Sequence, residues 1–280
     1  MDYRNLFRIE PGGKVDLNKI DPDFKGKHED KESAEIEIAR HNQKMRDLQY
    51  LMYAENGRSL LICLQAMDAA GKDGTINHVF GTMNPQGTRV HGFKTPSHEE
   101  AAHDFLWRIH GQVPAKGEVV IFNRSHYEDV LAVRVHRLVP KEVWSKRFDL
   151  INDFEQNLVE NGTHILKFFL HISEDEQLRR FKQRLDDPAR HWKISDADYA
   201  ERRLWPEYQD AYEDAIGKTS TKHAPWFVIP ANHKWFRNLA VSSIVVDTLE
   251  SLGMILPAPA VNIEDIRRQY HAAEKEEKKI

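Results

Sequence analysis

The sequence predicts an α/β fold in which a parallel β-sheet is covered by helices on both faces. Two patterns indicate this fold: short apolar runs of the kind found in strands buried on both faces, and longer stretches between them with apolar residues at helical spacing. The 280 residues suffice for one large domain with a full core. No internal repeat or low-complexity tract is present in the sequence, so a single three-layer α/β/α domain is the simplest prediction.

The expected strands are short, and turn or loop residues separate them from the helices. Residues 60–65 and 118–122 are the clearest, because their apolar runs are nearly continuous. The complete set is residues 60–65, 88–93, 118–122, 165–172 and 227–229. Ligands of parallel sheets bind at the carboxyl ends of the strands, so functional side chains should follow residues 65, 90, 122 and 229.

Helical spacing of apolar residues predicts helices before and between these strands. A capping box, Ser97 with Glu100, opens one of them, and Pro140 fits the first position of another. The expected helices cover residues 31–54, 71–83, 97–109, 140–160, a stretch after Ser173, and 235–252. We therefore divide the chain into an N-terminal arm with an amphipathic helix (1–55), a core (56–255) and a charged C-terminal tail (256–280), with the arm extended as far as residue 30.

Composition narrows the class of protein. The chain is 40% apolar and 30% charged with a net charge of -4, as in ordinary soluble proteins, so a polyanion could bind only at a local basic patch. The single cysteine, Cys63, cannot form an internal disulfide. No apolar stretch approaches the ~20 residues of a membrane helix, and the N-terminus lacks the apolar core of a signal peptide. We expect a cytoplasmic protein without a membrane or nucleic-acid partner.

A phosphate-binding loop follows the first strand. Residues 66–75, AMDAAGKDGT, match the P-loop pattern except that Ala66 replaces its first glycine and Asp73 its hydroxyl residue. Gly71 leaves room for a phosphate, and Lys72 can neutralise the group being transferred. The remaining predicted phosphate-binding residues are Ala69, Ala70, Asp73, Gly74 and Thr75. The alternative is an ordinary strand–turn–helix with a surface lysine.

Asp68 is unusual within such a loop. A carboxylate among phosphate ligands repels phosphate unless a metal ion or a proton intervenes. We interpret Asp68 as a residue that binds or positions Mg²⁺, or that orients an attacking phosphate. The alternative is a turn aspartate that caps the following helix.

A second group of polar residues follows the strand at 118–122. Asn123 and Arg124 come directly after it, and Glu128 and Asp129 follow. An arginine here can bridge donor and acceptor phosphates with its fork of N–H donors. Lys94, after the strand at 88–93, is similar to the acceptor-phosphate corner of nucleoside monophosphate kinases, although a solvent-exposed loop lysine is an equal alternative.

A basic segment at about residues 178–203 has the form of a lid. Eight lysines or arginines fall within these 26 residues, and Asp187-Pro188 separates two helical stretches. P-loop kinases close such helix pairs over their substrates to exclude water. Arg184 and Lys193 flank the break and are predicted to act on phosphates; the alternative is a solvated helix pair. Arg202 and Arg203 are interpreted as ordinary surface charge.

Three segments together closely resemble the second family of polyphosphate kinases, and its class III in particular. They are residues 67–75, 122–129 and 187–195, and the resemblance covers roughly residues 30–255. It implies a thymidylate-kinase-like P-loop fold with a helical lid, and Mg²⁺ dependence. It also implies reversible in-line transfer from inorganic polyphosphate to AMP and ADP, which gives ADP and ATP. Members typically form dimers or tetramers.

The resemblance also implies residue roles. Asp68 and Lys72 would serve the transferring phosphate, Arg124 the second motif, and Arg184 the lid. Other classes carry aspartate at the position of Asn123, and asparagine is a weak metal ligand. We therefore expect Asp129 to bind the metal together with Asp68, while Glu128 and Lys94 shape the nucleotide site.

Two other functions fit parts of this pattern. An ATP-dependent nucleoside monophosphate kinase shares the P-loop and the lid, but it needs the hydroxyl that Asp73 replaces, since that hydroxyl normally holds the Mg²⁺ of a nucleoside triphosphate. A non-catalytic polyanion-binding module is the other alternative. It has no need for the acid at position 68.

Overall fold

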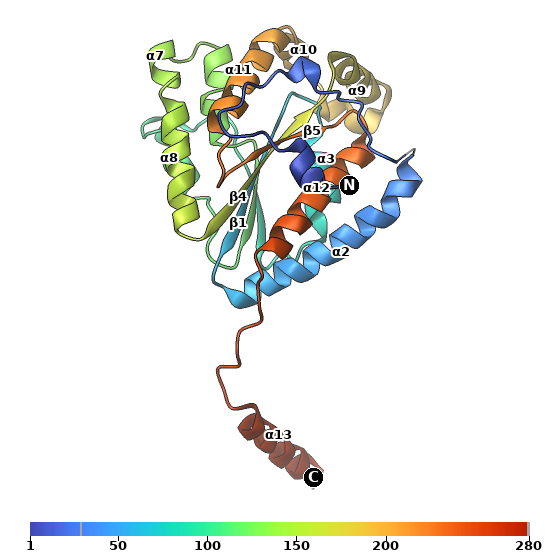
Figure 1. The fold of residues 1–280 in the computed structure, drawn as a ribbon, viewed down its shortest axis with the longest axis vertical. Coiled ribbons are helices and arrows are strands. Elements are labelled where there is room, and N and C mark those ends of the chain that lie inside the picture. Colours follow the sequence, from blue (N-terminus) through green and yellow to red (C-terminus); the bar gives the residue numbers. More distant parts are fainter. Residues whose placement is uncertain (29, 279–280) are drawn as a thin grey trace.

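The computed structural model describes residues 1–28 and 30–278. Its centre is a five-stranded parallel sheet with the strand order β2-β3-β1-β4-β5, which confirms the predicted α/β fold (Figure 1). The strands are β1 (Ser59–Ala66), β2 (Thr88–Gly92), β3 (Val119–Asn123), β4 (Thr163–His171) and β5 (Trp226–Pro230). Each lies within a few residues of its predicted segment.

The sheet explains why the first predicted strand is so apolar. β1 lies in the middle, with Leu60 opposite Val119 of β3 on one side and opposite His164 of β4 on the other. Every residue of β1 is buried, because helices cover both faces. The carboxyl ends of β1 and β3 are adjacent, and this brings the loop after Ala66 beside the residues after Phe122.

Helices form the two outer layers. α2 runs beside α12 on one face of the sheet, while α7 and α8 lie on the other side (Figure 1). The helices are α1 (Tyr3–Phe7), α2 (Lys31–Glu55), α3 (Lys72–His78), α4 (His98–Ala101), α5 (Trp107–His110), α6 (Ala132–Val135), α7 (Lys141–Trp144), α8 (Arg147–Glu160), α9 (Glu174–Asp186), α10 (Asp196–Arg202), α11 (Trp205–Thr219), α12 (Lys234–Ser251) and α13 (Ile263–Glu277). Short 3₁₀ turns are η1 (Leu17–Lys19), η2 (Phe80–Thr82), η3 (His126–Asp129) and η4 (Pro188–Lys193).

Some predicted helices are shorter or divided. The capping box at Ser97 is present, but the helix expected over 97–109 breaks into α4 and α5, because the Asp104 carboxylate accepts the backbone N–H of Leu106 and turns the chain. The helix expected over 140–160 divides into α7 and α8, and α3 ends at His78. The segment predicted as a lid contains most of α9 together with η4 and α10, and its action as a lid stays a prediction.

The N-terminal segment differs from the extended arm that its polar composition predicts. Tyr3 and Phe7 of α1 are buried and pack around Phe236 of α12, and Leu17 is also buried. The Ile9 N–H donates to the Trp226 carbonyl, so the segment lies along β5. Tyr3 and Phe7 lie about one helical turn apart, but α1 is only five residues long and charged residues flank it, so the polar composition of the segment outweighs this short pattern.

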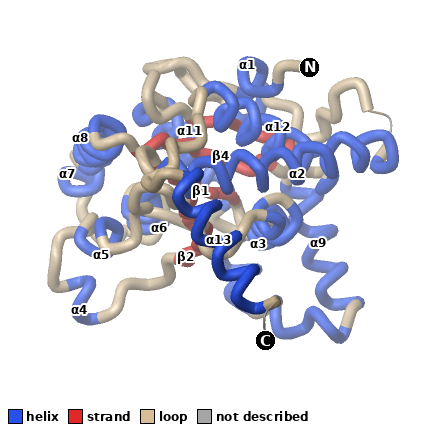
Figure 2. The backbone as a smooth tube through the Cα atoms, turned by 90° about the horizontal axis from the view of Figure 1, so that it is seen from below, coloured by secondary structure: helices blue, strands red, loops and turns tan. Residues whose placement is uncertain are grey.

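The C-terminal segment stands away from the domain. α13 lies beyond the sheet and its helices in Figure 1, at the end of the segment that follows α12, and none of its residues is buried. Seen from below in Figure 2, α13 lies in front of the domain. Among the described residues, no helix is long and apolar enough to cross a membrane.

Candidate active site

The loop between β1 and α3 has the backbone of a tight phosphate-binding turn. Gly71 adopts φ +108°, and a Cβ at this position would collide with the guanidinium of Arg237. Ala69 also lies in the left-handed region, at φ +62°, which is unusual for a residue with a side chain. Thr75 is buried, and its hydroxyl donates to the Gly71 carbonyl at 3.2 Å, so this side chain braces the loop from behind.

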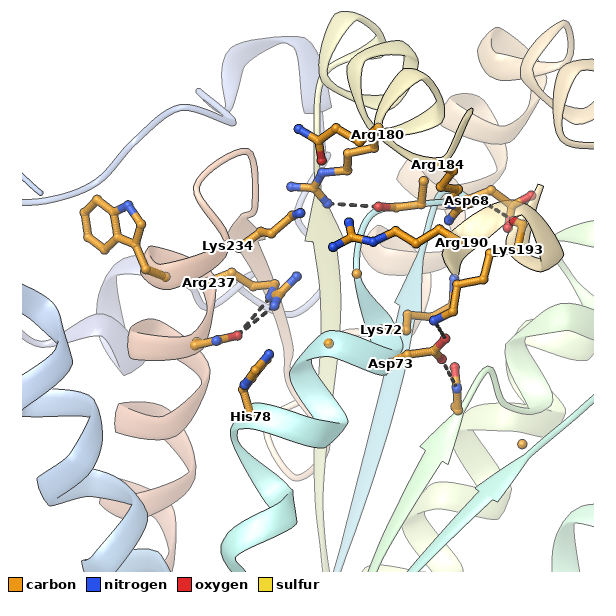
Figure 3. Close-up of a pocket in the computed structure, with 18 of the residues that line it drawn as sticks. Asp68, Lys72, Asp73, His78, Arg180, Arg184, Arg190, Lys193, Lys234 and Arg237 are labelled. Atoms are coloured by element: carbon orange, nitrogen blue, oxygen red, sulfur yellow. Dashed lines mark hydrogen bonds and ion pairs between the residues drawn. The ribbon is translucent and has the colours of Figure 1, made fainter. Parts of the chain in front are cut away.

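Lys72 and Asp68 lie at the mouth of this loop (Figure 3). The Lys72 ammonium donates to the Ala66 carbonyl at 3.0 Å, and its burial lowers the pKa of Lys72. The Asp68 carboxylate accepts a hydrogen bond from Arg124 at 3.3 Å. The structure therefore brings together three of the predicted catalytic residues.

Asp73, in the position of the P-loop hydroxyl, connects three elements. Its carboxylate accepts from the Asn123 amide at 2.9 Å and lies 3.8 Å from the Lys193 ammonium of the lid. The side chain is 72% exposed and faces the same opening as Asp68. Asp73 thus joins the phosphate loop to the end of β3 and to the lid.

A cavity of 1530 Å³ opens in front of the loop and under the lid. Figure 3 shows cationic side chains from α9, η4 and α12 turned toward the P-loop. Acidic residues are fewer on its wall, which carries Lys31, Lys72, Lys94, Arg124, Arg180, Arg184, Arg190, Lys193, Lys234 and Arg237 against Glu35, Asp68, Asp73 and Asp187. The predicted phosphate residues Ala69, Gly71 and Gly74 also line it, whereas Ala70 is fully buried.

Arg180 and Arg237 are site residues that the sequence analysis does not single out. Arg180 is buried, and its guanidinium donates to the Ala69 and Ala70 carbonyls at 2.9 and 2.7 Å. Arg237 is also buried; it contacts Asn238 but pairs with no carboxylate among the described residues. Burial and the neighbouring Arg180 lower the pKa of Arg237 to about 9. A buried cation of this kind is stabilised when an anion binds beside it in the cavity.

A second cavity of 480 Å³ lies on the other side of Asp68 and Arg124, and both residues line both cavities. Its wall is less charged and more aromatic: it includes Trp205, Tyr208 and Tyr212. Glu128 also lines it, and burial raises the pKa of this carboxyl against the opposing effect of Arg124. Lys94, predicted as a nucleotide residue, lines the large cavity and is absent from this wall.

Asp129 is placed apart from the other predicted residues. Its carboxylate accepts from Arg147 of α8 at 3.0 Å and lies 3.9 Å from Arg108 of α5. It lines neither cavity, because the η3 turn directs the end of the second motif toward these helices. The structure therefore does not bring Asp129 to Asp68 as the predicted metal pair requires. Within residues 1–28 and 30–278, no three His, Cys, Asp or Glu side chains cluster in a way that could hold a metal ion.

The lid residues contact one another as well as the cavity. Arg184 donates to the Lys193 carbonyl at 2.8 Å and to the Asp198 carboxylate at 3.3 Å, so it ties α9 to η4 and α10. Both Arg184 and Lys193 line the large cavity, and their action on phosphates stays a prediction.

Comparison with known proteins identifies the family. Residues 28–254 match the model of the polyphosphate kinase 2 family. The chain is 53% identical over 93% of its length to an AMP/ADP-polyphosphate phosphotransferase of Meiothermus ruber, covering 98% of that protein. It is 45% identical over 90% of its length to an ADP-polyphosphate phosphotransferase of Rhodopseudomonas palustris, covering 91% of it. The crystal structure of polyphosphate kinase 2 from Arthrobacter aurescens superposes with a TM-score of 0.93 at 42% identity, over 97% of both chains. The chain therefore belongs to the polyphosphate kinase 2 family.

Proposed function

We propose that this protein transfers phosphoryl groups from inorganic polyphosphate to AMP and ADP, and that it catalyses the reverse reactions. One observation carries the proposal: two cavities of different chemical character meet at Asp68 and Arg124. The names of the Meiothermus and Rhodopseudomonas relatives agree with it.

The large cavity is suited to the polyphosphate donor. Its 1530 Å³ exceed the roughly 300–1,000 Å³ of most small-molecule sites, as a polymer site requires. Its cations come from α2, α9, η4 and α12, from the segments that follow β2 and β3, and from the phosphate loop itself. A chain with a net charge of -4 therefore concentrates positive charge where a polyanion can bind.

The smaller cavity is suited to the nucleotide acceptor. Its 480 Å³ lie within the usual range for a small ligand, roughly 300–1,000 Å³. The aromatic side chains of Trp205, Tyr208 and Tyr212 offer apolar surface for a base or ribose, and Arg124 can receive the acceptor phosphate.

The residues between the cavities are suited to phosphoryl transfer. The transition state of this reaction spreads negative charge over the transferring oxygens. Arg124 can donate to donor and acceptor phosphates from its rigid fork, and Lys72 can stabilise charge on the donor side. Lid closure by α9, η4 and α10 would exclude water, which competes with the nucleotide as acceptor.

The residues at this junction fit a magnesium ion. Mg²⁺ commonly binds one or two carboxylates together with waters and substrate phosphates, so it does not need a cluster of three acids. Asp68 lines both cavities, which makes it the suitable carboxylate. The ion would neutralise charge on the phosphates. Asp129, held by Arg147, is not part of this proposed site.

An assay of donor and acceptor tests the proposal. Full-length protein is incubated with Mg²⁺, polyphosphate and AMP, and ADP and ATP are followed by chromatography, with ATP plus AMP as the parallel donor test. We expect ADP and then ATP to form from polyphosphate alone. The Lys72→Met variant should lose turnover on the order of 100-fold or more while its thermal unfolding stays near that of the wild type. Turnover only with ATP would leave an ordinary nucleotide kinase.

The assembly implied by the family resemblance is a dimer or a tetramer. Light scattering of the purified protein would measure it directly, and a monomer at all concentrations would contradict it.

A further inference from the structure

Arg202, at the end of the lid helix α10, reaches back to the first lid helix. Its guanidinium donates to the side-chain oxygen of Gln177 at 2.9 Å and to the Glu174 carbonyl at 2.8 Å. The side chain is only 20% exposed, in contrast to the neighbouring Arg203, which is exposed. Arg202 is thus more than the surface charge that the sequence suggests.

Gln177 connects this arginine to the phosphate loop. The residue is 2% exposed, and its amide nitrogen donates to the Asp68 carbonyl at 3.0 Å. A single amide therefore accepts from the lid and donates to the loop. Arginine is a donor only, so Arg202 fixes the amide with its oxygen toward the lid and its nitrogen toward Asp68.

The loop needs such a restraint. Ala69, directly after Asp68, is held in the left-handed region, which a residue with a side chain adopts only when its surroundings compel it. α9 holds three successive carbonyls of this loop, Asp68 through Gln177, and Ala69 and Ala70 through Arg180. Arg180 also donates to the Ala231 and Asn232 carbonyls, outside the lid, whereas Gln177 is bound by Arg202 of α10.

We propose that Gln177 and Arg202 are positioning residues that couple closure of the lid to the placement of Asp68. The inference rests on the proposed function, because it assigns these residues to transfer at the junction of the two cavities. When α10 lies against α9, Arg202 orients the Gln177 amide and the amide holds the loop. When α10 leaves, the amide loses its fixed orientation and Asp68 loses one restraint. Transfer is thereby favoured when the lid excludes water.

Four variants of the full-length protein test the relay. Gln177→Met keeps the volume and removes both hydrogen bonds, and Arg202→Gln removes the lid contact. Gln177→Glu keeps an acceptor for Arg202 but removes the donor to Asp68. Arg203→Gln is the matched control on the same helix end. Gln177 and Arg202 also line the smaller cavity, but their hydrogen bonds join α9, α10 and the phosphate loop. For the first three variants we therefore expect kcat to fall on the order of tenfold, with KM for polyphosphate and for AMP changed less than about twofold. Arg203→Gln should stay within about twofold of the wild type.

Non-additivity is the sharper criterion. If the two residues act as one unit, the variant with both Gln177→Met and Arg202→Gln should lose no more kcat than the larger single loss. Phosphate released from polyphosphate without nucleotide should rise relative to transfer in each relay variant. Additive losses, or an Arg202→Gln variant that behaves like Arg203→Gln, would overturn the proposal. A rise in KM for AMP alone would make Arg202 a nucleotide-binding residue instead.

Amide hydrogen exchange separates this inference from the proposed function. In the free protein, exchange at residues 67–71 should be faster in Gln177→Met and Arg202→Gln than in the wild type and in Arg203→Gln. If the wild type forms no ADP from polyphosphate, the proposed function has failed, and this measurement still decides the relay. If Gln177→Met fails to fold, Gln177→Glu decides it. Unchanged exchange in the folded variants would refute it.

Discussion

Lys167 is a lysine in the middle of β4 with no exposed surface, and its removal should be costly. Its ammonium donates to Glu155 at 2.5 Å, to the Tyr127 hydroxyl at 2.9 Å and to the Thr219 carbonyl at 2.7 Å. Glu155 is equally buried and also accepts from His126 and Tyr127. We consider the substitution Lys167→Met, which keeps most of the volume and removes the cation.

The expected loss of unfolding free energy follows from the groups that the substitution leaves buried. Removing one partner leaves Glu155 buried without its cation, and broken buried ion pairs typically cost about 3–5 kcal/mol. Lys167 also lowers the pKa of Glu155 against the large opposing effect of burial, so its loss should drive this carboxyl toward protonation. Glu155→Gln in the same chain keeps an oxygen for His126 and Tyr127. The double variant should therefore recover much of the loss, since neutral pairs avoid the desolvation of charge.

Urea unfolding at neutral pH measures these free energies, and the four chains form a double-mutant cycle. For a chain of this size, each kcal/mol lost from the free energy of unfolding lowers Tm by about 2–4 °C, so Lys167→Met should lower Tm by roughly 6–20 °C. A cost below about 1 kcal/mol, or a double variant less stable than Lys167→Met, would refute the reasoning that this network depends on paired charge. The wild type and Glu155→Gln complete the cycle as references.

Three further predictions concern the site. KM for polyphosphate should rise steeply with salt while KM for AMP changes little, because the donor releases counterions along a cationic cavity; equal dependence in salt-titrated kinetics would contradict this. Gly71→Ala should abolish most turnover, since its Cβ collides with Arg237 at φ +108°, and retained activity would show that the loop can relax. Burial raises the pKa of Glu128, so the stability that its carboxyl contributes is lost as pH rises through the folded-state pKa. Relative to the wild type, Glu128→Gln should therefore gain stability in urea unfolding as the pH rises above about 4, the ordinary pKa of glutamate, and a difference that stays constant with pH would exclude this.

Much of the fold is predictable because its signals are local. A strand buried on both faces must be apolar along its length, and β1 carries that pattern regardless of what covers it. The break between α4 and α5 is different. It depends on one side chain, Asp104, whose carboxylate accepts the Leu106 N–H and so ends the helix. Many aspartates within helices make no such bond, so the residue type alone does not predict the break. The packing of Tyr3 and Phe7 could not be predicted for a different reason: it depends on a partner more than 200 residues away, Phe236.

The residues of the site also fall into those that a local pattern predicts and those that it does not. Asp68, Lys72 and Arg124 follow directly from two strand ends that the sheet makes adjacent. Asp129 lies only five residues after Arg124, but the same argument does not place it correctly. A single 3₁₀ turn directs its side chain toward Arg147 and away from Asp68. Arg237 has no local signal beyond its charge, yet it collides with any side chain at Gly71. Its part in the site therefore appears only when the fold brings α12 beside the phosphate loop.

The replacement of the P-loop hydroxyl by Asp73 fits a polymeric donor. A hydroxyl there normally holds the Mg²⁺ of a nucleoside triphosphate, whereas Asp73 is engaged by Asn123 and by Lys193 of the lid. Asp73 therefore connects the phosphate loop to the lid, and the position offers no hydroxyl for Mg²⁺. The donor phosphates need other ligands. The cavity supplies these ligands as cations from α9, η4 and α12. One of them, Arg237, is buried and pairs with no carboxylate among the described residues. An enzyme that holds its donor through many separate cations can bind a chain of phosphates at any register, and this is the property that distinguishes a polyphosphate donor from a single nucleotide.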